Sequence, residues 1–223
     1  MSRLSESPLG VAVMSIVLSV VIPAVAVGGL SSCAGPRPRL GPVVAADDGR
    51  TRDATIALVG DSLTVGEFTT LPAGAAERGL RLDISAQIGR QIPEGVDELR
   101  RLAGRDLVVV ALGTNDARVG LTSAAADALI DQTLDVAGAA RPVMWLTVYR
   151  GPASPEGPAV EVFNAALARA VQRHPNLVLA DWAGVVRSQP ALLAADQVHL
   201  TEAGYARRSR WLVHHMASLL APG

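Results

Sequence analysis

The chain has 223 residues, of which 49% are hydrophobic, so it can form one domain with a sizeable core but hardly two ordinary domains. The formal net charge is −1 and only 3% of the residues are aromatic. This composition argues against a broad electrostatic contact with nucleic acid and against a stacking surface for single strands. The one cysteine, Cys33, excludes an internal disulfide and a metal site built from several cysteines.

The first 33 residues have the pattern of an export signal. Arg3 precedes an apolar stretch over residues 9–30. The run Leu30-Ser31-Ser32-Cys33 resembles a bacterial lipobox, in which small residues precede the cysteine that receives lipid. We therefore expect lipidation at Cys33, with an uncleaved anchor or ordinary signal cleavage as the alternatives. All three place the rest of the chain outside the cytoplasm.

Residues 34–52 are rich in proline, glycine and charge and show no strand or helix period, which predicts a flexible tether. The remaining domain, residues 53–223, alternates strand and helix patterns. Short apolar runs predict buried strands over residues 55–59, 80–86, 106–112, 142–148 and 177–180. Helical spacing predicts helices over residues 93–102, 123–137, 159–174 and 201–220. This alternation predicts a three-layer α/β domain with a mainly parallel sheet, whose site lies at the carboxyl ends of the strands.

Three of these strand ends carry residues that could take part in catalysis. Gly60-Asp61-Ser62-Leu63 follows the first strand and exposes a serine at a tight turn, although Asp61 and Ser62 would also cap a helix. Gly89 follows the second strand and either offers its N–H to a ligand or is an ordinary loop glycine. Gly113-Thr114-Asn115-Asp116 follows the third strand, where an amide suits an oxyanion but the same residues also form turns.

A fourth block, Asp196-Gln197-Val198-His199, precedes the last helix. A histidine can take a serine's proton near neutral pH, and a carboxylate one turn away can hold its tautomer. The local alternative is a capping aspartate beside a surface histidine. Each block has such an explanation alone, but capping and turns do not explain all four blocks together.

Taken together, the four blocks resemble those of SGNH (GDSL-type) hydrolases, over about residues 55–220. The resemblance implies a flavodoxin-like α/β/α sandwich with a five-stranded parallel sheet. It implies Ser62 as nucleophile, His199 as general base and then acid, and Asp196 as the orienting carboxylate. It also implies an oxyanion hole from the N–H groups of Ser62 and Gly89 and the side chain of Asn115, with no metal and no cofactor. The G-x-S-x-G elbow of α/β-hydrolases is absent.

The expected function is that of an extracytoplasmic serine esterase, which hydrolyses short-chain acyl esters through an acyl-serine intermediate. Residues 84–91 resemble, more loosely, the second block of SGNH domains that acetylate or deacetylate envelope polysaccharides. An acyltransferase acting on an envelope glycan or glycolipid is therefore the alternative, and a non-catalytic envelope-binding lipoprotein is a further one.

The expected partner is an acyl-ester small molecule or an envelope glycan or lipid, with the membrane reached only through the N-terminus and no nucleic acid bound. The sequence does not predict an oligomeric state. Residues 152–158 are a candidate rim or lid, and Arg90 is alternatively a solvated loop residue. The candidate substrate contacts are Asp61, Arg90, Gln91, Tyr149 and Val198.

Overall fold

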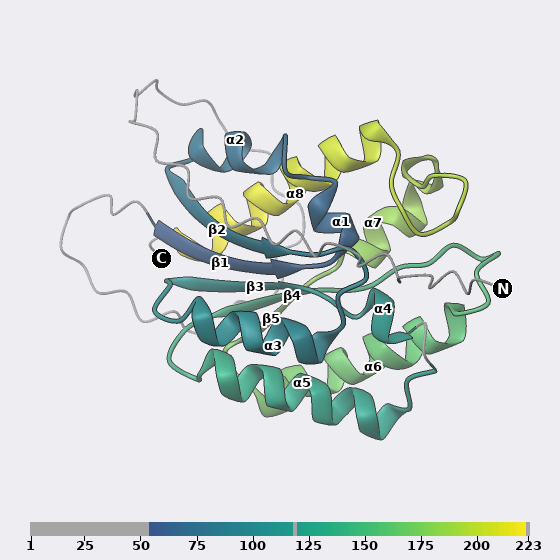
Figure 1. Cartoon of the computed structure of the whole chain (residues 1–223), viewed down its shortest axis with the longest axis horizontal. Coiled ribbons are helices and arrows are strands. Elements are labelled where there is room, and N and C mark those ends of the chain that lie inside the picture. The colour runs from purple at the N-terminus through teal and green to yellow at the C-terminus, as the bar shows by residue number, and fades with distance from the viewer. Residues whose placement is uncertain (1–53, 118–119, 222–223) are drawn as a thin grey trace, which may run out of the picture.

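The structure is a computed structural model, and it describes residues 54–117 and 120–221. Its strands form one parallel five-stranded sheet in the order β2-β1-β3-β4-β5 (Figure 1). The strands are β1 (Ala54–Gly60), β2 (Leu80–Ala86), β3 (Leu107–Ala111), β4 (Val143–Leu146) and β5 (Leu177–Ala180). This strand order is the flavodoxin-like one. From β1 the chain adds β2 on one side of the sheet and then β3, β4 and β5 on the other side, so the switch point lies between β1 and β3. The expected flavodoxin-like sandwich is confirmed.

Helices cover both faces of the sheet, as Figure 1 shows. One layer consists of α3 (Ile92–Arg101), α5 (Ser123–Ala137) and α6 (Gly157–Arg173). The other layer contains α2 (Leu71–Ala76) and α8 (Glu202–Leu220). Short helical segments complete the chain: α1 (Ser62–Val65), α4 (Thr114–Ala117), α7 (Trp182–Ser188) and the 3-10 turn η1 (Pro190–Leu192).

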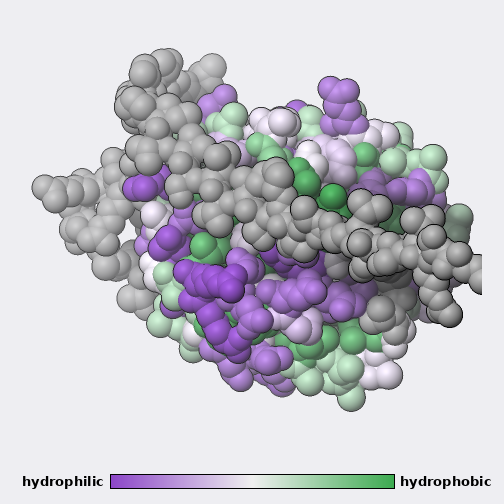
Figure 2. Space-filling model, viewed as in Figure 1, coloured by the Kyte–Doolittle hydropathy of each residue, from purple (hydrophilic) through white to green (hydrophobic). Residues whose placement is uncertain are grey.

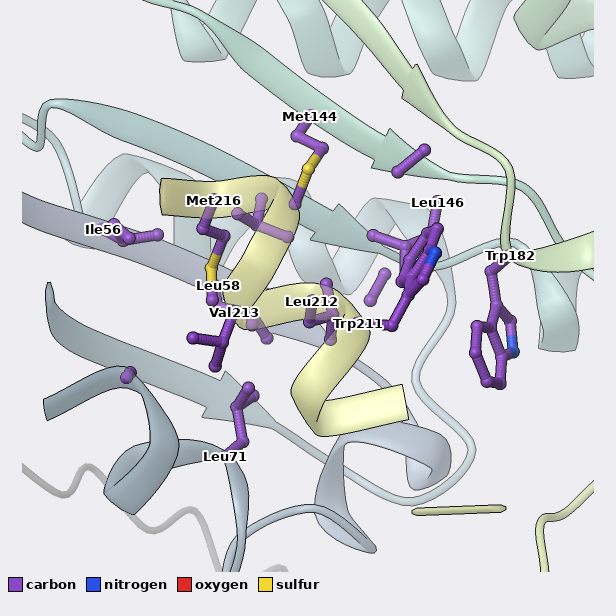
Figure 3. Close-up of a cluster of buried hydrophobic side chains, with 14 of the residues drawn as sticks. Ile56, Leu58, Leu71, Met144, Leu146, Trp182, Trp211, Leu212, Val213 and Met216 are labelled. Atoms are coloured by element: carbon purple, nitrogen blue, oxygen red, sulfur yellow. The ribbon is translucent and has the colours of Figure 1, made fainter. Parts of the chain in front are cut away.

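The residues of β1 alternate between the two cores, because successive side chains of a strand point to opposite faces. Ile56 and Leu58 face the layer of α2 and α8, whereas Ala57 and Val59 face the layer of α3, α5 and α6. Figure 3 shows the first of these cores, in which side chains of α8 pack against β1 and β4. All four of these β1 residues are fully buried, so the strand is fixed from both sides.

The second core contains Trp145, a fully buried residue of β4 whose indole N–H donates to the Leu112 carbonyl at 3.1 Å. Its ring packs against Phe163 of α6, with the two centroids 6.1 Å apart. Helix α3 packs its apolar side chains into this core and turns its polar side chains to solvent. Figure 2 shows hydrophilic residues gathered over it. The sheet is thus covered by an amphipathic helix layer on this side.

The predicted lipidation site Cys33 and the predicted tether over residues 34–52 lie outside the described residues. Across residues 54–117 and 120–221, no helix has both the length and the apolar character needed to cross a bilayer.

Candidate active site

Ser62 is placed by the tight turn between β1 and α1. Gly60 ends the strand, and a Cβ at this position would lie only 2.1 Å from the Thr64 Oγ1 atom. A side chain here would therefore push Thr64, which is fully buried, out of the turn. Ser62 is the first residue of α1, and this helix lies at the end of the sheet to which the strand arrows point in Figure 1.

Asp61 is the N-cap residue of α1 and directly precedes Ser62. Its Oδ1 atom accepts from the Leu63 N–H at 3.0 Å, and the residue is fully buried. Burial raises the pKa of Asp61, although the Leu63 N–H, the Arg208 guanidinium and the Thr114 hydroxyl each lower it. The expected contact between Asp61 and substrate is therefore corrected: this carboxyl lies inside the domain and supports the turn.

His199 and Asp196 continue from Ser62 in a chain of hydrogen bonds. The His199 Nε2 atom lies 3.0 Å from the Ser62 Oγ, and the His199 Nδ1 atom lies 2.6 Å from the Asp196 Oδ2. A carboxylate beside Nδ1 favours the tautomer that is protonated there, which leaves Nε2 free to accept from the serine. The sequence separates Ser62 from the other two residues widely, and the fold brings them together.

Asp196 is held as an anion by its neighbours. The hydrogen bond from His199 lowers the pKa of Asp196 to about 2, and the N–H groups of Val198 and His199 add to this effect. These two N–H groups donate to the other carboxylate oxygen, Oδ1, at 3.1 and 2.9 Å. The carboxylate therefore has a fixed orientation as well as a fixed charge near neutral pH.

The loop that carries this pair is closed at its base by an antiparallel bridge between Leu193 and Leu200. Within it the Ala194 N–H donates to the His199 carbonyl at 2.8 Å. Gln197 lies in the left-handed region, with φ of 62°, which costs a residue with a side chain about 1–3 kcal/mol. Such a conformation persists only where the surroundings impose it. The chain therefore carries strain between Asp196 and His199.

The segments after β2 and β3 carry the candidate oxyanion donors. The Asn115 Nδ2 atom donates to the Arg90 carbonyl at 3.0 Å, which leaves the second amide hydrogen for another acceptor. Asp116 accepts from the Ile92 N–H with both oxygens, at 3.1 and 3.2 Å. Gly89 has φ of 78° and lies on the loop that these contacts hold. The block after β3 thus fixes the loop after β2.

A comparison with protein families decides what these blocks belong to. Residues 58–207 match the GDSL-like Lipase/Acylhydrolase family. The chain belongs to this family. The matched segment includes the serine turn, the loop of Gly89, the Asn115 block and the Asp196–His199 loop. No curated protein sequence matched the chain.

Solved structures of other proteins share this GDSL-type fold. A lipase/acylhydrolase from Enterococcus faecalis has 22% identity and a TM-score of 0.65, over 76% of this chain and 98% of that one. The catalytic domain of the Streptococcus pneumoniae peptidoglycan O-acetyltransferase A has 19% identity and a TM-score of 0.62, over 75% and 92%. A carbohydrate esterase family 3 protein from Talaromyces cellulolyticus has 19% identity and a TM-score of 0.61, over 74% and 97%. At these identities the likeness shows a common fold.

Arg90 was expected to contact substrate or solvent, but the structure buries it. Its side chain is only 2% exposed and donates to the Ser85 carbonyl at 2.6 Å and to the Gly60 carbonyl at 3.3 Å. Neither the expected substrate contact nor the solvated alternative fits this burial. The guanidinium instead ties the loop of Gly89 to the ends of β1 and β2.

The other predicted contact residues are partly exposed. Gln91 is the N-cap residue of α3, and its N–H donates to the Glu94 carboxylate at 3.3 Å. Tyr149 packs partly against the core, with the Arg187 guanidinium 5.7 Å from its ring centroid. Val198 contributes its N–H to Asp196, as described above. Contacts of these three side chains with substrate stay predictions.

Three charged residues near the site have no predicted role from the sequence. Arg150, which is 9% exposed, donates to the Thr114 carbonyl at 3.0 Å. Glu67 and Arg208 form a buried ion pair, which the Ser209 hydroxyl joins by donating to Glu67 at 3.3 Å. The sequence places Arg150 shortly after the fourth predicted strand, on the predicted active edge, but gives it no role there. No local pattern marks the other two, because their partners are distant in sequence.

Within the described ranges, no group of three or more His, Cys, Asp or Glu residues is arranged to hold a metal ion.

Proposed function

We propose that this chain is a serine esterase that hydrolyses short-chain acyl esters through an acyl intermediate on Ser62. The observation that carries the proposal is the continuous chain from the Ser62 Oγ through His199 to Asp196, with contacts of 3.0 and 2.6 Å. Both distances lie within the range that a nucleophile, a base and an orienting carboxylate require. Membership of a lipase/acylhydrolase family supports the same chemistry.

In the proposed mechanism the Ser62 Oγ attacks the ester carbonyl carbon while the His199 Nε2 takes the hydroxyl proton. Asp196 stabilises the imidazolium that forms. The carbonyl oxygen becomes an oxyanion and accepts from the N–H groups of Ser62 and Gly89 and from the free amide hydrogen of Asn115. The bond to the leaving alcohol then breaks, and His199 returns the proton to that alcohol.

Water completes the cycle. His199 takes a proton from a water molecule, whose oxygen attacks the acyl carbon on Ser62. The second tetrahedral intermediate breaks to release the carboxylic acid, and Ser62 recovers its proton. Every proton transfer in the two halves uses His199.

A second candidate function differs only in the acceptor. If a sugar hydroxyl replaces water, the same acyl-serine gives O-acyl transfer to an envelope glycan. The shared fold of a peptidoglycan O-acetyltransferase domain supports this alternative. We rank hydrolysis first because the matching family is one of acylhydrolases. For either reaction we propose an extracytoplasmic site, tethered through lipid at Cys33.

The test compares the purified chain with its Ser62→Ala variant on p-nitrophenyl acetate. We expect the variant to lose turnover by about 10⁴-fold or more, since the nucleophile is gone. Ser218→Ala is the matched control, because this exposed hydroxyl only donates to the His214 carbonyl of its own helix. Undiminished turnover in Ser62→Ala would contradict the proposal.

A fluorophosphonate probe gives an independent measurement. Mass spectrometry should place its adduct on Ser62 in the wild type and find none in Ser62→Ala. An adduct on another residue would contradict the nucleophile, and a folded wild type without any adduct would support the non-catalytic alternative. Adding sugar acceptors to a chain-length series of acyl esters then separates transfer from hydrolysis.

A further inference from the structure

Two distant parts of the chain supply the two sides of the proposed site. Asn115 stands on the block after β3, and His199 stands on the loop before α8. The loop between β4 and α6 contacts both. Arg150 donates to the Thr114 carbonyl at 3.0 Å, and the Gly151 N–H donates to the Gln197 carbonyl at 2.7 Å. Adjacent residues thus bridge the oxyanion side and the histidine side.

The contact at Gly151 is a close one. A Cβ at this position would lie 2.0 Å from the Gln197 Oε1 and 2.8 Å from the Gln197 Cβ. The Oε1 atom can swing away, but the Cβ moves only with the backbone of the loop. The backbone of Gly151 lies outside the left-handed region, so only this packing, and not its φ angle, disfavours a side chain.

The other end of the bridge is also held. Arg150 is buried, and its Nη1 atom lies 3.4 Å from the Glu156 Oε2, which also accepts from the Ser154 hydroxyl at 2.6 Å. The Ser154 N–H in turn donates to the Gly151 carbonyl at 2.9 Å. The segment from Arg150 to Glu156 is therefore tied to itself as well as to the two sides of the site.

We propose that Arg150 and Gly151 form a brace that sets the position of His199 relative to the oxyanion donors. Both are positioning residues. In this proposal the segment from Arg150 to Glu156 is a fixed support, whereas the sequence made residues 152–158 a candidate rim or lid. The proposal rests on the proposed esterase function. A support is needed because the loop is exposed. The side chains of His199 and Asp196 are 43% and 52% exposed, so packing alone does not hold this part of the loop.

The brace should act on turnover more than on substrate binding. The general base must meet the serine and the leaving group within a fraction of an ångström, and a displacement of about 1 Å can cost on the order of 100-fold in rate. Loss of the brace would move the base without removing any residue that touches the substrate. We therefore expect kcat to fall while KM changes little.

The decisive experiment is a cycle of Gly151→Ala, Gln197→Gly and the double variant, assayed in the full chain on p-nitrophenyl acetate. Gly151→Ala should lower kcat by about 10–100-fold per titrated active site, because its Cβ displaces the Gln197 backbone. Gln197→Gly keeps the carbonyl and suits the left-handed φ, so its kcat should stay within about threefold of the wild type. In the double variant the obstructing side chain is gone, and kcat should return to the level of Gln197→Gly.

Substitutions at Arg150 give a second test, which does not depend on whether Gly151→Ala folds. Arg150→Met should lower kcat in the same range, and Arg150→Lys should recover part of it because the ammonium still donates to a carbonyl. Arg169→Met is the matched control, since this partly exposed residue of α6 pairs with Asp127 away from the site. A merely structural role would lower the melting temperature of Gly151→Ala and Arg150→Met without changing their kcat per titrated site.

The outcomes separate the brace from the proposed function. An active wild type with unchanged kcat in Gly151→Ala and Arg150→Met would overturn the brace alone. A double variant as slow as Gly151→Ala would also overturn it, because the loss would not pass through Gln197. A folded wild type that neither hydrolyses the ester nor reacts with a fluorophosphonate would overturn the proposed function, and the brace with it.

Discussion

Asn115 donates one amide hydrogen to the Arg90 carbonyl, and this contact determines how the whole amide is oriented. The residue is only 8% exposed, so its second hydrogen points into a restricted space. Arg90 in turn is held by the carbonyls of Ser85 and Gly60. At the scale of single residues, the candidate oxyanion donor is therefore positioned before any substrate arrives, which is what electrostatic stabilisation of a transition state requires.

We expect Asn115→Ala to lower kcat by about 10²–10³-fold with little change in KM, because the lost donor serves the transition state more than the bound ester. The measurement is steady-state hydrolysis of p-nitrophenyl acetate. Asn176→Ala is the matched control: its amide also holds backbone carbonyls, of Gly138 at 3.1 Å and Arg141 at 2.9 Å, but at the amino end of β4. Equal losses in the two variants would contradict the role of Asn115.

At the scale of elements, the buried pair of Glu67 and Arg208 joins the segment after α1 to helix α8. These two pieces of chain follow Ser62 and His199, so the pair holds together the supports of the proposed nucleophile and the proposed base. Burial raises the pKa of Glu67 to about 7, and Arg208 opposes this rise. The guanidinium also lies 5.8 Å from the Trp182 ring centroid. Removing one partner would leave the other charge buried without compensation.

We expect Arg208→Met at pH 8 to lower the free energy of unfolding by about 3–5 kcal/mol, because it leaves the Glu67 carboxylate buried without a partner. Glu67→Gln should cost less, because its neutral side chain avoids the burial penalty that raises the pKa of Glu67. The double variant should cost clearly less than the sum, because neither charge is then left alone. Urea unfolding measures all three. The surface pair Arg169 and Asp127 is the control, for which about 0–1 kcal/mol is expected. Additive losses at Glu67 and Arg208 would show that the two side chains act independently.

At the scale of the whole molecule, several buried carboxyl groups favour their protonated form. Burial raises the pKa of Glu67 to about 7 and that of Asp116 to about 6. It raises the pKa of Asp61 as well. Asp196 has the opposite shift, to about 2, because His199 and two backbone N–H groups stabilise its anion. The folded domain therefore binds more protons than the unfolded chain between about pH 4 and 7.

The sign of the pH dependence follows from these directions. Stability from a raised carboxyl pKa is complete below the unfolded value and is lost as pH rises through the folded value. We expect the free energy of unfolding to fall by about 2 kcal/mol or more between pH 5 and pH 8. Urea unfolding across this range measures it. Glu67→Gln should flatten the slope, because the side chain at this position then no longer titrates between pH 5 and pH 8. Stability that rises with pH would contradict this account.

Much of the fold could be predicted because its strands and long helices carry strong local patterns. The runs at residues 80–86 and 177–180 match β2 and β5, and residues 123–137 match α5. The short helices α1, α2, α4 and α7 were not predicted, because four to seven residues are too few to show a helical period. Their ends are set by the strands and caps around them.

The sequence by itself determined the layered α/β class and the four blocks that meet at the carboxyl end of the sheet, because hydrophobic period and strand-end position are local properties. Only the tertiary structure decided that Arg90 and Asp61 point inward and that Arg150 and Gly151 reach both sides of the site. Arginine and aspartate are usually exposed. Here Arg90 and Arg150 are buried where backbone carbonyls accept from their guanidinium groups, and Asp61 is buried where the Leu63 N–H donates to it. Such partners exist only after the chain has folded.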